Sequence, residues 1–295
     1  MTPTIAVLGT GILGRAIAER LQAAGCTVIV FNRTASKALQ LQRQGIAVVG
    51  SPEMAISQSD CTLLLLADAA AVRSTLLTPS CSVALRGKTL VQMGTIGPEE
   101  SIQLQEDIER SGGVYCEAPV LGSVAEAKEG TLFVMMGGSE QQFAACLPVF
   151  RVLSREPRYV GPVGRASALK LALNHLIAAE TSAFALSLGL VQRFGISVDA
   201  FMAILRGSAL YAPTFDKKLP RLLKRDYHRP NFSTRHLLKD VRLVLNQAAT
   251  LGLSTNALDG LPVLLEEAIA RGLGDLDYSA LFEVVSPLES GSRHS

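Results

Sequence analysis

The chain lacks tryptophan, and only 5% of its 295 residues are aromatic. Charged residues are also few, at 18%, and both signs contribute to a net charge of only +2. A protein whose main partner is nucleic acid carries a strongly basic patch, so this composition argues against that class of partner. Hydrophobic residues make up 48% of the chain, which suffices for a sizeable core. Because a single core rarely serves more than about 250–300 residues, we expect two domains.

Cysteine is scarce as well: the chain has five, an odd number, and no Cys-x-x-Cys pair. This count and spacing argue against a disulfide framework, and we expect reduced, mostly buried thiols in a cytoplasmic protein. At Cys116, which lies beside a candidate site, a reactive thiol is the alternative to a buried one. None of the four histidines has metal-ligand spacing with an acidic or cysteine partner, so we predict no metal site.

Long apolar runs without polar residues are missing too. The most apolar long stretch, residues 166–191, contains Lys170, Asn174 and Glu180. Each of these would be costly in lipid, so we predict a helix buried in protein and no membrane partner. A strand-like run starts within a few residues of position 1, from which we expect no signal peptide. The small polar residues at 288–295 predict a disordered tail.

The most informative motif follows the first apolar run, which ends in Gly9-x-Gly11-x-x-Gly14. In a dinucleotide-binding βαβ unit, the first glycine permits a tight turn and the second lets the backbone approach a pyrophosphate. The third glycine lets the helix pack closely on the strand. The helix that begins at Ile12 and Leu13 would then offer backbone N–H groups to the phosphates. The motif therefore predicts a nucleotide-binding domain.

The second strand of this unit should end near Phe31, where an acidic residue normally binds the ribose of NAD. Here the sequence reads Asn32-Arg33-Thr34. No carboxylate would repel a 2′-phosphate, and the Arg33 guanidinium could bind one with two hydrogen bonds. The alternative is an ordinary solvated turn. We predict NADP(H) as the cofactor.

Strand-like runs alternate with helical patterns over residues 1–162, which is typical of a doubly wound parallel sheet of the Rossmann type. The expected strands are residues 5–8, 26–31, 47–49, 61–66, 89–92, 114–116, 131–136 and 158–160. The expected helices, besides the one after Gly14, include residues 36–44, 98–111 and 140–153.

Strand signals stop after residue 162, and residues 163–287 predict an all-α C-terminal domain. The expected helices are residues 167–194, 198–207, 218–225, 234–251, 258–271 and 278–284. The first of them would be a long interdomain helix, so we look for the active site at this junction. Lys170 and Asn174 are four residues apart on it and share one helix face. From spacing alone, Lys170 is either held for chemistry or snorkelling at a boundary.

At this point the chain resembles the β-hydroxyacid dehydrogenases, which include 3-hydroxyisobutyrate dehydrogenase and the glyoxylate/succinic semialdehyde reductases. The resemblance covers nearly the whole chain in the family's order. It is carried by the glycine motif at residues 9–14, by Gly94-Thr95, by Glu117-Ala118-Pro119-Val120-Leu121-Gly122-Ser123, by Gly161, Gly164, Ala166, Lys170 and Asn174, and by Phe232, Lys239 and Asp240.

The resemblance implies a role for each matched position. Lys170 would be the general acid/base, assisted by Asn174. The expected substrate-binding residues are Leu121, Gly122, Ser123, Phe232 and Lys239. The expected cofactor-binding residues are Gly9, Gly11, Ile12, Leu13, Gly14, Asn32, Arg33, Thr34, Thr95 and Asp240. For Lys239 and Asp240, a solvated helix-surface pair is the alternative.

Three positions depart from the family pattern. Leu121 stands where the family has a serine that holds the substrate carboxylate, which puts the substrate in doubt. Glu117 replaces an aspartate and Ala166 replaces a glycine, and we expect both to be tolerated.

The function implied is an NADPH-dependent reductase, reversible as a dehydrogenase, that converts a small aldehyde or keto acid to the hydroxyacid. Expected substrates are succinic semialdehyde, glyoxylate, or the pair 3-hydroxyisobutyrate and methylmalonate semialdehyde. One alternative is an imine reductase on the same fold, although such enzymes generally replace the lysine. Another is a catalytically silent NADPH-binding scaffold. Family members assemble through the helical domain, so we expect a homodimer or homotetramer.

Overall fold

The structure, a computed structural model, describes residues 3–288 and divides into two compact units, Met1–Leu171 and Ala172–Ser295. The predicted domain boundary at 162/163 preceded the long helix, whereas the division of the structure falls inside that helix. The first turns of the helix therefore belong with the sheet. The predicted tail at 288–295 lies outside the described residues apart from Leu288.

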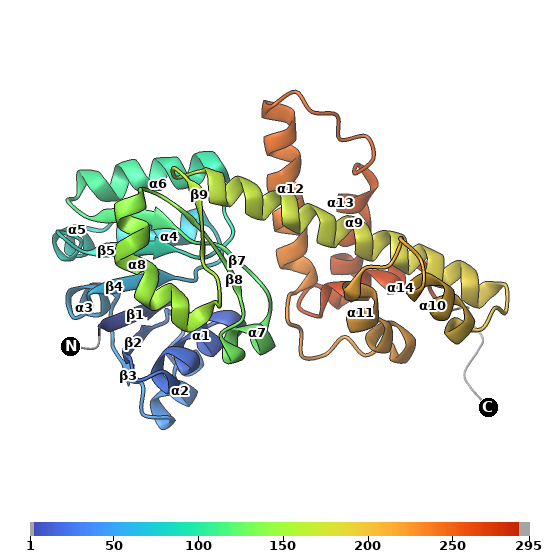
Figure 1. Cartoon of the computed structure of the whole chain (residues 1–295), viewed down its shortest axis with the longest axis horizontal. Coiled ribbons are helices and arrows are strands. Elements are labelled where there is room, and N and C mark those ends of the chain that lie inside the picture. Colours follow the sequence, from blue (N-terminus) through green and yellow to red (C-terminus); the bar gives the residue numbers. More distant parts are fainter. Residues whose placement is uncertain (1–2, 289–295) are drawn as a thin grey trace. The chain divides into compact units, whose positions relative to one another are not determined.

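The first unit is built on a sheet with the strand order β3-β2-β1-β4-β5-β6-β8-β7, and β9 pairs with β8 (Figure 1). The strands from β3 to β6 are all parallel, whereas β8 runs antiparallel to β6 and β7. The strands are β1 (Thr4–Leu8), β2 (Thr27–Phe31), β3 (Ala47–Val48), β4 (Cys61–Leu64), β5 (Thr89–Gln92), β6 (Val114–Glu117), β7 (Val120–Leu121), β8 (Phe133–Gly137) and β9 (Arg158–Gly161).

Helices cover both faces of this sheet, as its apolar strands require. Along β1, Ile5 and Val7 face one hydrophobic cluster, while Ala6 and Leu8 face the other. Helices α1 (Ile12–Ala23), α2 (Leu39–Arg43) and α8 (Glu140–Leu153) contribute to the first cluster, together with α7 (Val124–Glu129). Helices α3 (Pro52–Ser57), α4 (Ala69–Leu76), α5 (Pro79–Ala84) and α6 (Pro98–Arg110) contribute to the second. The predicted doubly wound fold is confirmed.

The second unit is helical, as predicted. Its helices are the C-terminal part of α9 (Arg165–Arg193), α10 (Val198–Arg206), α11 (Pro213–Lys224), α12 (Thr234–Thr250), α13 (Gly260–Ala268) and α14 (Phe282–Val285), with short turns at Ile269–Leu273 and Tyr278–Leu281. A shared core of leucine and aromatic side chains holds them together, including Phe184, Leu237 and Phe282. An isolated bridge between Ser233 and Asp277 joins the start of α12 to the turn before α14.

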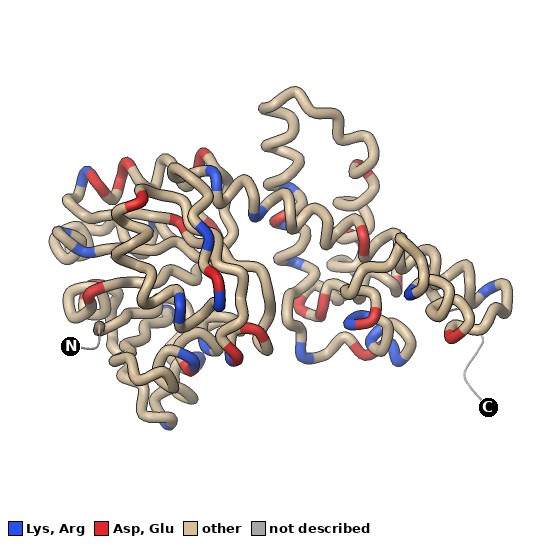
Figure 2. Tube along the Cα trace, viewed as in Figure 1, with Lys and Arg blue, Asp and Glu red and all other residues tan. Residues whose placement is uncertain are grey.

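Helix α9 is, among residues 3–288, the one helix long and apolar enough to cross a membrane by length and composition. Lys170, Asn174 and Thr181 are nevertheless buried along it. Buried polar groups on a helix need protein partners, so a packed helix remains our expectation. Figure 2 shows Lys and Arg interspersed with Asp and Glu in each unit, in keeping with the small net charge.

Candidate active site

The glycine turn between β1 and α1 has the geometry that a dinucleotide needs. A Cβ on Gly9, whose φ is +100°, would lie 2.4 Å from the Leu65 carbonyl oxygen. A Cβ on Gly14 would lie 2.0 Å from the Gly9 carbonyl oxygen, so both positions exclude a side chain. At Gly11, in contrast, a Cβ would meet nothing within 4 Å. This exposed glycine leaves open space over the start of α1, where backbone N–H groups attract phosphate.

Asn32 ties the end of β2 to this turn. Its side-chain oxygen accepts the Thr10 N–H at 3.0 Å, and its amide donates to the Thr34 carbonyl at 2.9 Å. These bonds shape the loop in which Arg33 and Thr34 are exposed. Asn32 thus stabilises the loop through its side-chain hydrogen bonds. Arg33 follows β2 at the carboxyl edge of the sheet, where ligands of open α/β sheets bind.

The same edge carries the turn after β5. The Gln92 side chain donates to the Gly94 carbonyl at 3.0 Å, and a Cβ on Gly94 would lie 2.6 Å from the Leu66 carbonyl oxygen. Thr95 follows, half-buried, at the carboxyl end of the strand. The structure therefore brings the turns after β1, β2 and β5 to one edge.

The turn between β7 and α7 lies close to the glycine loop. A pocket of about 220 Å³ in the first unit is lined by both Ile12 and Val124, the first residues of α1 and α7. Ser123 caps α7: its amide and hydroxyl both donate to the Glu126 carboxylate, at 2.8 and 2.5 Å. In this structure the Ser123 donors thus serve the helix. Leu121 is half-buried and pairs with Phe133 on β8.

Lys170 extends from the second turn of α9 and is 9% exposed. The first turn of this helix is bonded to Glu117, the last residue of β6. One Glu117 oxygen, Oε1, accepts the backbone N–H groups of Gly164, Ala166 and Ser167 at 2.9, 2.8 and 3.0 Å. The start of the helix that carries Lys170 is therefore attached to the carboxyl edge of the parallel sheet.

The polar residues predicted on the helical side lie together in the second unit. The Asn174 amide donates to the Asp240 carboxylate at 2.6 Å, and both side chains are buried. The Lys239 ammonium lies 2.9 Å from the other Asp240 oxygen. Asp240 was predicted to bind the cofactor; here its carboxylate holds the predicted catalytic amide.

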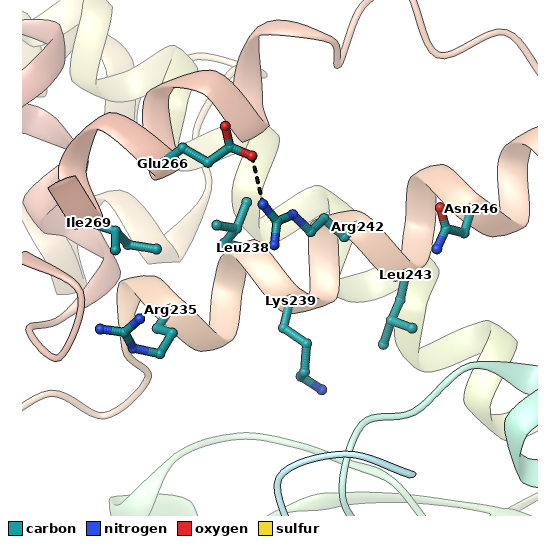
Figure 3. Close-up of a pocket in the computed structure, with 8 residues that line it drawn as sticks. All are labelled: Arg235, Leu238, Lys239, Arg242, Leu243, Asn246, Glu266 and Ile269. Atoms are coloured by element: carbon teal, nitrogen blue, oxygen red, sulfur yellow. Dashed lines mark hydrogen bonds and ion pairs between the residues drawn. The ribbon is translucent and has the colours of Figure 1, made fainter. Parts of the chain in front are cut away.

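Phe232 precedes α12 and packs edge-on against Tyr278, with ring centroids 5.8 Å apart. Lys239 is among the residues lining a pocket of about 470 Å³ on α12 and α13. Figure 3 shows its ammonium pointing away from the Arg242–Glu266 ion pair on the other side of this pocket. Sequence reasoning singled out Phe232 and Lys239 but missed the pairing of Asp240 with Asn174.

No cluster of three or more metal-ligating side chains occurs within residues 3–288. Hydrogen bonding with Cys146 and burial raise the pKa of the Cys116 thiol well above its ordinary value. The described thiols are free of disulfides, and Cys116 is buried. The structure thus favours the buried reading of Cys116 over the reactive one.

Comparisons with known proteins agree with this geometry. Residues 4–161 match the family model of the NAD binding domain of 6-phosphogluconate dehydrogenase. Residues 164–285 match the model described as NAD-binding of NADP-dependent 3-hydroxyisobutyrate dehydrogenase. The two models meet at the start of α9.

Glyoxylate/succinic semialdehyde reductase 1 of Arabidopsis thaliana is 33% identical over 283 residues, covering 95% of this chain and 98% of the relative. The structure of Mycobacterium tuberculosis 3-hydroxyisobutyrate dehydrogenase with L-serine has a TM-score of 0.85 at 24% identity, covering 97% and 99% of the two chains. An imine reductase from Myxococcus stipitatus in complex with NADP+ has a TM-score of 0.68 at 22% identity, covering 95% and 98%. The chain therefore belongs to the β-hydroxyacid dehydrogenase family and is an oxidoreductase of the type that acts on CH–OH groups, with a nicotinamide-nucleotide-binding domain.

Proposed function

We propose that the protein is an NADPH-dependent reductase that converts a small aldehyde or keto acid to the corresponding hydroxyacid. The observation that carries this proposal is Lys170, a buried lysine fixed at the carboxyl edge of the sheet by the bonds between Glu117 and the start of α9. The name of the Arabidopsis relative supports glyoxylate and succinic semialdehyde as first candidates for the substrate.

The residues at the glycine turn fit a dinucleotide. Gly11 leaves the start of α1 open, and a pyrophosphate there would meet the backbone N–H groups of Ile12 and Leu13. The exposed Arg33 would hold a 2′-phosphate, which NADP(H) has and NAD(H) lacks. Thr95 would line the same edge. A bound nicotinamide supplies the hydride in this class of chemistry.

Lys170 would provide the proton. As hydride reaches a carbonyl carbon, negative charge develops on the oxygen, and an ammonium within hydrogen-bond distance stabilises that charge. The ammonium then gives its proton to the oxygen, and the resulting amine regains one from water. Asn174, held by Asp240 at 2.6 Å, would orient the substrate through its amide. General acid catalysis of this kind contributes about 10²–10⁴-fold.

The class of substrate that the protein accepts depends on the turn between β7 and α7. Leu121 offers an apolar side chain, and the Ser123 hydroxyl is bonded to Glu126. These two features weaken the case for a substrate carboxylate gripped by a side-chain hydroxyl at this turn. They are also the observations that favour the second candidate function, reduction of an imine, which needs no such grip.

The test is a substrate panel with NADPH: aldehydes and keto acids graded by chain length, and a cyclic imine. Lys170→Ala should lower kcat by about 10²–10⁴-fold while the Kd for NADPH stays unchanged, because only proton donation is lost. Leu169→Ala, at the adjacent exposed position on α9, is the matched control and should behave as wild type.

Near-wild-type turnover of the Lys170→Ala variant would contradict the mechanism. Preference for the cyclic imine would select the second candidate function. NADPH binding without turnover of any panel member would instead indicate a silent scaffold.

We also propose that the protein is a homo-oligomer built through α9. Large apolar side chains are exposed along this helix: Leu176, Leu186 and Leu190 are each more than half exposed in the single chain. A stripe of this kind on one helix is typical of a subunit interface.

A further inference from the structure

We infer that Glu117 is a positioning residue for the reaction, fixing the start of α9 so that Lys170 meets the reacting oxygen. This inference rests on the proposed function of Lys170. It assigns a role to a residue that appeared in the sequence only as a tolerated replacement of aspartate. Glu117 does not need to touch substrate or cofactor for this role.

The Glu117 carboxylate is fully buried and uses both of its oxygens. Oε1 accepts three backbone N–H groups at the start of α9, as described above. Oε2 accepts the Ser167 hydroxyl at 2.5 Å and also the Ser101 hydroxyl on α6. Five donors from two helices therefore converge on one side chain at the end of β6.

These donors give both oxygens of the buried Glu117 side chain hydrogen-bond partners. The first N–H groups of a helix lack partners within the helix, and they carry the positive end of its dipole. Ser101 is itself held by the Tyr115 hydroxyl at 2.8 Å, so the cluster is anchored on the Glu117 strand as well.

The distance from this clamp to Lys170 is short. Lys170 follows Ala166 by four residues and Ser167 by three, which is about 4.5–6 Å along the helix axis. A rotation or tilt that displaces the first turn would therefore displace the ammonium by about as much as it displaces that turn. Since a misplacement of about 1 Å can cost about 10²-fold in rate, the clamp matters for the chemistry as well as for folding.

The neighbouring strand is adapted to the length of glutamate. Gly137 on β8 is the direct partner of Glu117, and a Cβ there would lie 2.5 Å from Glu117 Oε1 and 2.8 Å from Cγ. A side chain at position 137 would thus displace the carboxylate. Gly137→Ala therefore perturbs these hydrogen bonds while the residue at position 117 remains a glutamate.

The experiment compares two changes at Glu117. Glu117→Gln keeps the length of the side chain: its oxygen can accept the same three N–H groups, and its amide can donate to the two hydroxyls. Glu117→Asp keeps the charge but is one methylene shorter. Glu100→Asp is the matched control, since Glu100 accepts the Gly97 N–H at 2.7 Å and caps α6 instead of α9.

Positioning predicts that kcat falls about 10²-fold in Glu117→Asp, with KM and the Kd for NADPH within threefold of wild type. Gly137→Ala should likewise lower kcat with little change in KM or in the Kd for NADPH, whereas Glu117→Gln should keep most of the wild-type kcat. Glu100→Asp should lower the melting temperature alone. If Glu117→Asp fails to fold, Gly137→Ala replaces it as the test variant and is judged by the same changes in kcat, KM and Kd.

Wild-type kcat in both Glu117→Asp and Gly137→Ala would overturn the inference. So would a loss of kcat in Glu100→Asp equal to that in Glu117→Asp, because capping alone would then explain the effect. Failure of the proposed function looks different: Lys170→Ala would stay active whatever the Glu117 variants do.

Discussion

The buried ion pair between Lys218 and Asp277 should be a main support of the helical unit. The Lys218 ammonium lies 2.7 and 3.0 Å from the two Asp277 oxygens, and the residues are only 8% and 0% exposed. Asp277 also bridges to Ser233 at the start of α12, the helix that carries Lys239 and Asp240. Asp277→Asn leaves the ammonium buried without its counter-charge.

Removing one partner of a buried pair typically costs about 3–5 kcal/mol. The Tyr278 ring, 4.0 Å from the ammonium, still contacts the charge in the variant, so we expect a cost at the lower end of this range, about 3 kcal/mol. Glu266→Gln is the matched control: Glu266 lies 2.8 Å from Arg242, but both side chains are at least half exposed. An exposed pair of this kind is worth about 0.2–1 kcal/mol.

The pH dependence provides a second test. Burial lowers the pKa of Lys218 below its ordinary value of 10.5, while Asp277 opposes that shift. Without Asp277, the pKa of Lys218 falls further. Between this lowered pKa and 10.5 the unfolded state binds more protons than the folded state, so stability rises with pH. The deficit of Asp277→Asn relative to wild type should therefore shrink as the pH rises toward 10.

Urea unfolding followed by far-UV circular dichroism measures both effects, through the shift of the midpoint at constant slope. The reasoning is refuted if Asp277→Asn costs no more than Glu266→Gln at pH 7. It is equally refuted if the deficit grows with pH.

Two further predictions concern the cofactor and the assembly. Arg33→Ala should weaken NADPH binding by about 10–150-fold and leave NADH binding unchanged, because a hydrogen bond to a charged group is worth about 1.5–3 kcal/mol. Arg43→Ala on α2 is the control. Equal effects on the binding of both cofactors would refute the assignment of Arg33 to the 2′-phosphate. Light scattering of the wild-type protein should give a mass of at least twice the 31.3 kDa of one chain. The Leu186→Glu/Leu190→Glu variant should give a smaller mass, and a wild-type mass of one chain would exclude the assembly.

The sequence was most informative where a local pattern decides the structure. The glycine motif and the apolar runs predicted the strands from β1 to β6, and α8 spans residues 140–153 as expected. The short helices α3, α4, α5 and α7 were missed because segments of six to eight residues show little helical periodicity. Strand β7 was also missed, because its place depends on antiparallel pairing with β8, which the sequence does not show.

In the candidate site, too, residues in a local pattern could be predicted from the sequence, whereas long-range contacts could not. Lys170 and Asn174 could be found from their spacing on one helix and from the family motif. The bond from Asn174 to Asp240 joins residues 66 positions apart, and the bonds from Glu117 to the start of α9 join residues 47 to 50 apart. No local pattern encodes such contacts, because they depend on how the elements fold together. A signal was nevertheless present, since the carboxylate of Glu117 directly follows the apolar strand predicted at residues 114–116.

Two buried carboxylates, Glu117 and Asp240, form hydrogen bonds with different parts of α9. Glu117, in the first unit, binds the backbone of the first turn and so sets where Lys170 begins. Asp240, in the second unit, binds the Asn174 side chain and leaves the backbone alone. A change at Glu117 should therefore act on Lys170 through the helix, whereas a change at Asp240 should act on Asn174 directly. Because the helix links the two residues, the effects on kcat of Glu117→Asp and Asp240→Asn should deviate from additivity when combined, as expected of coupled sites.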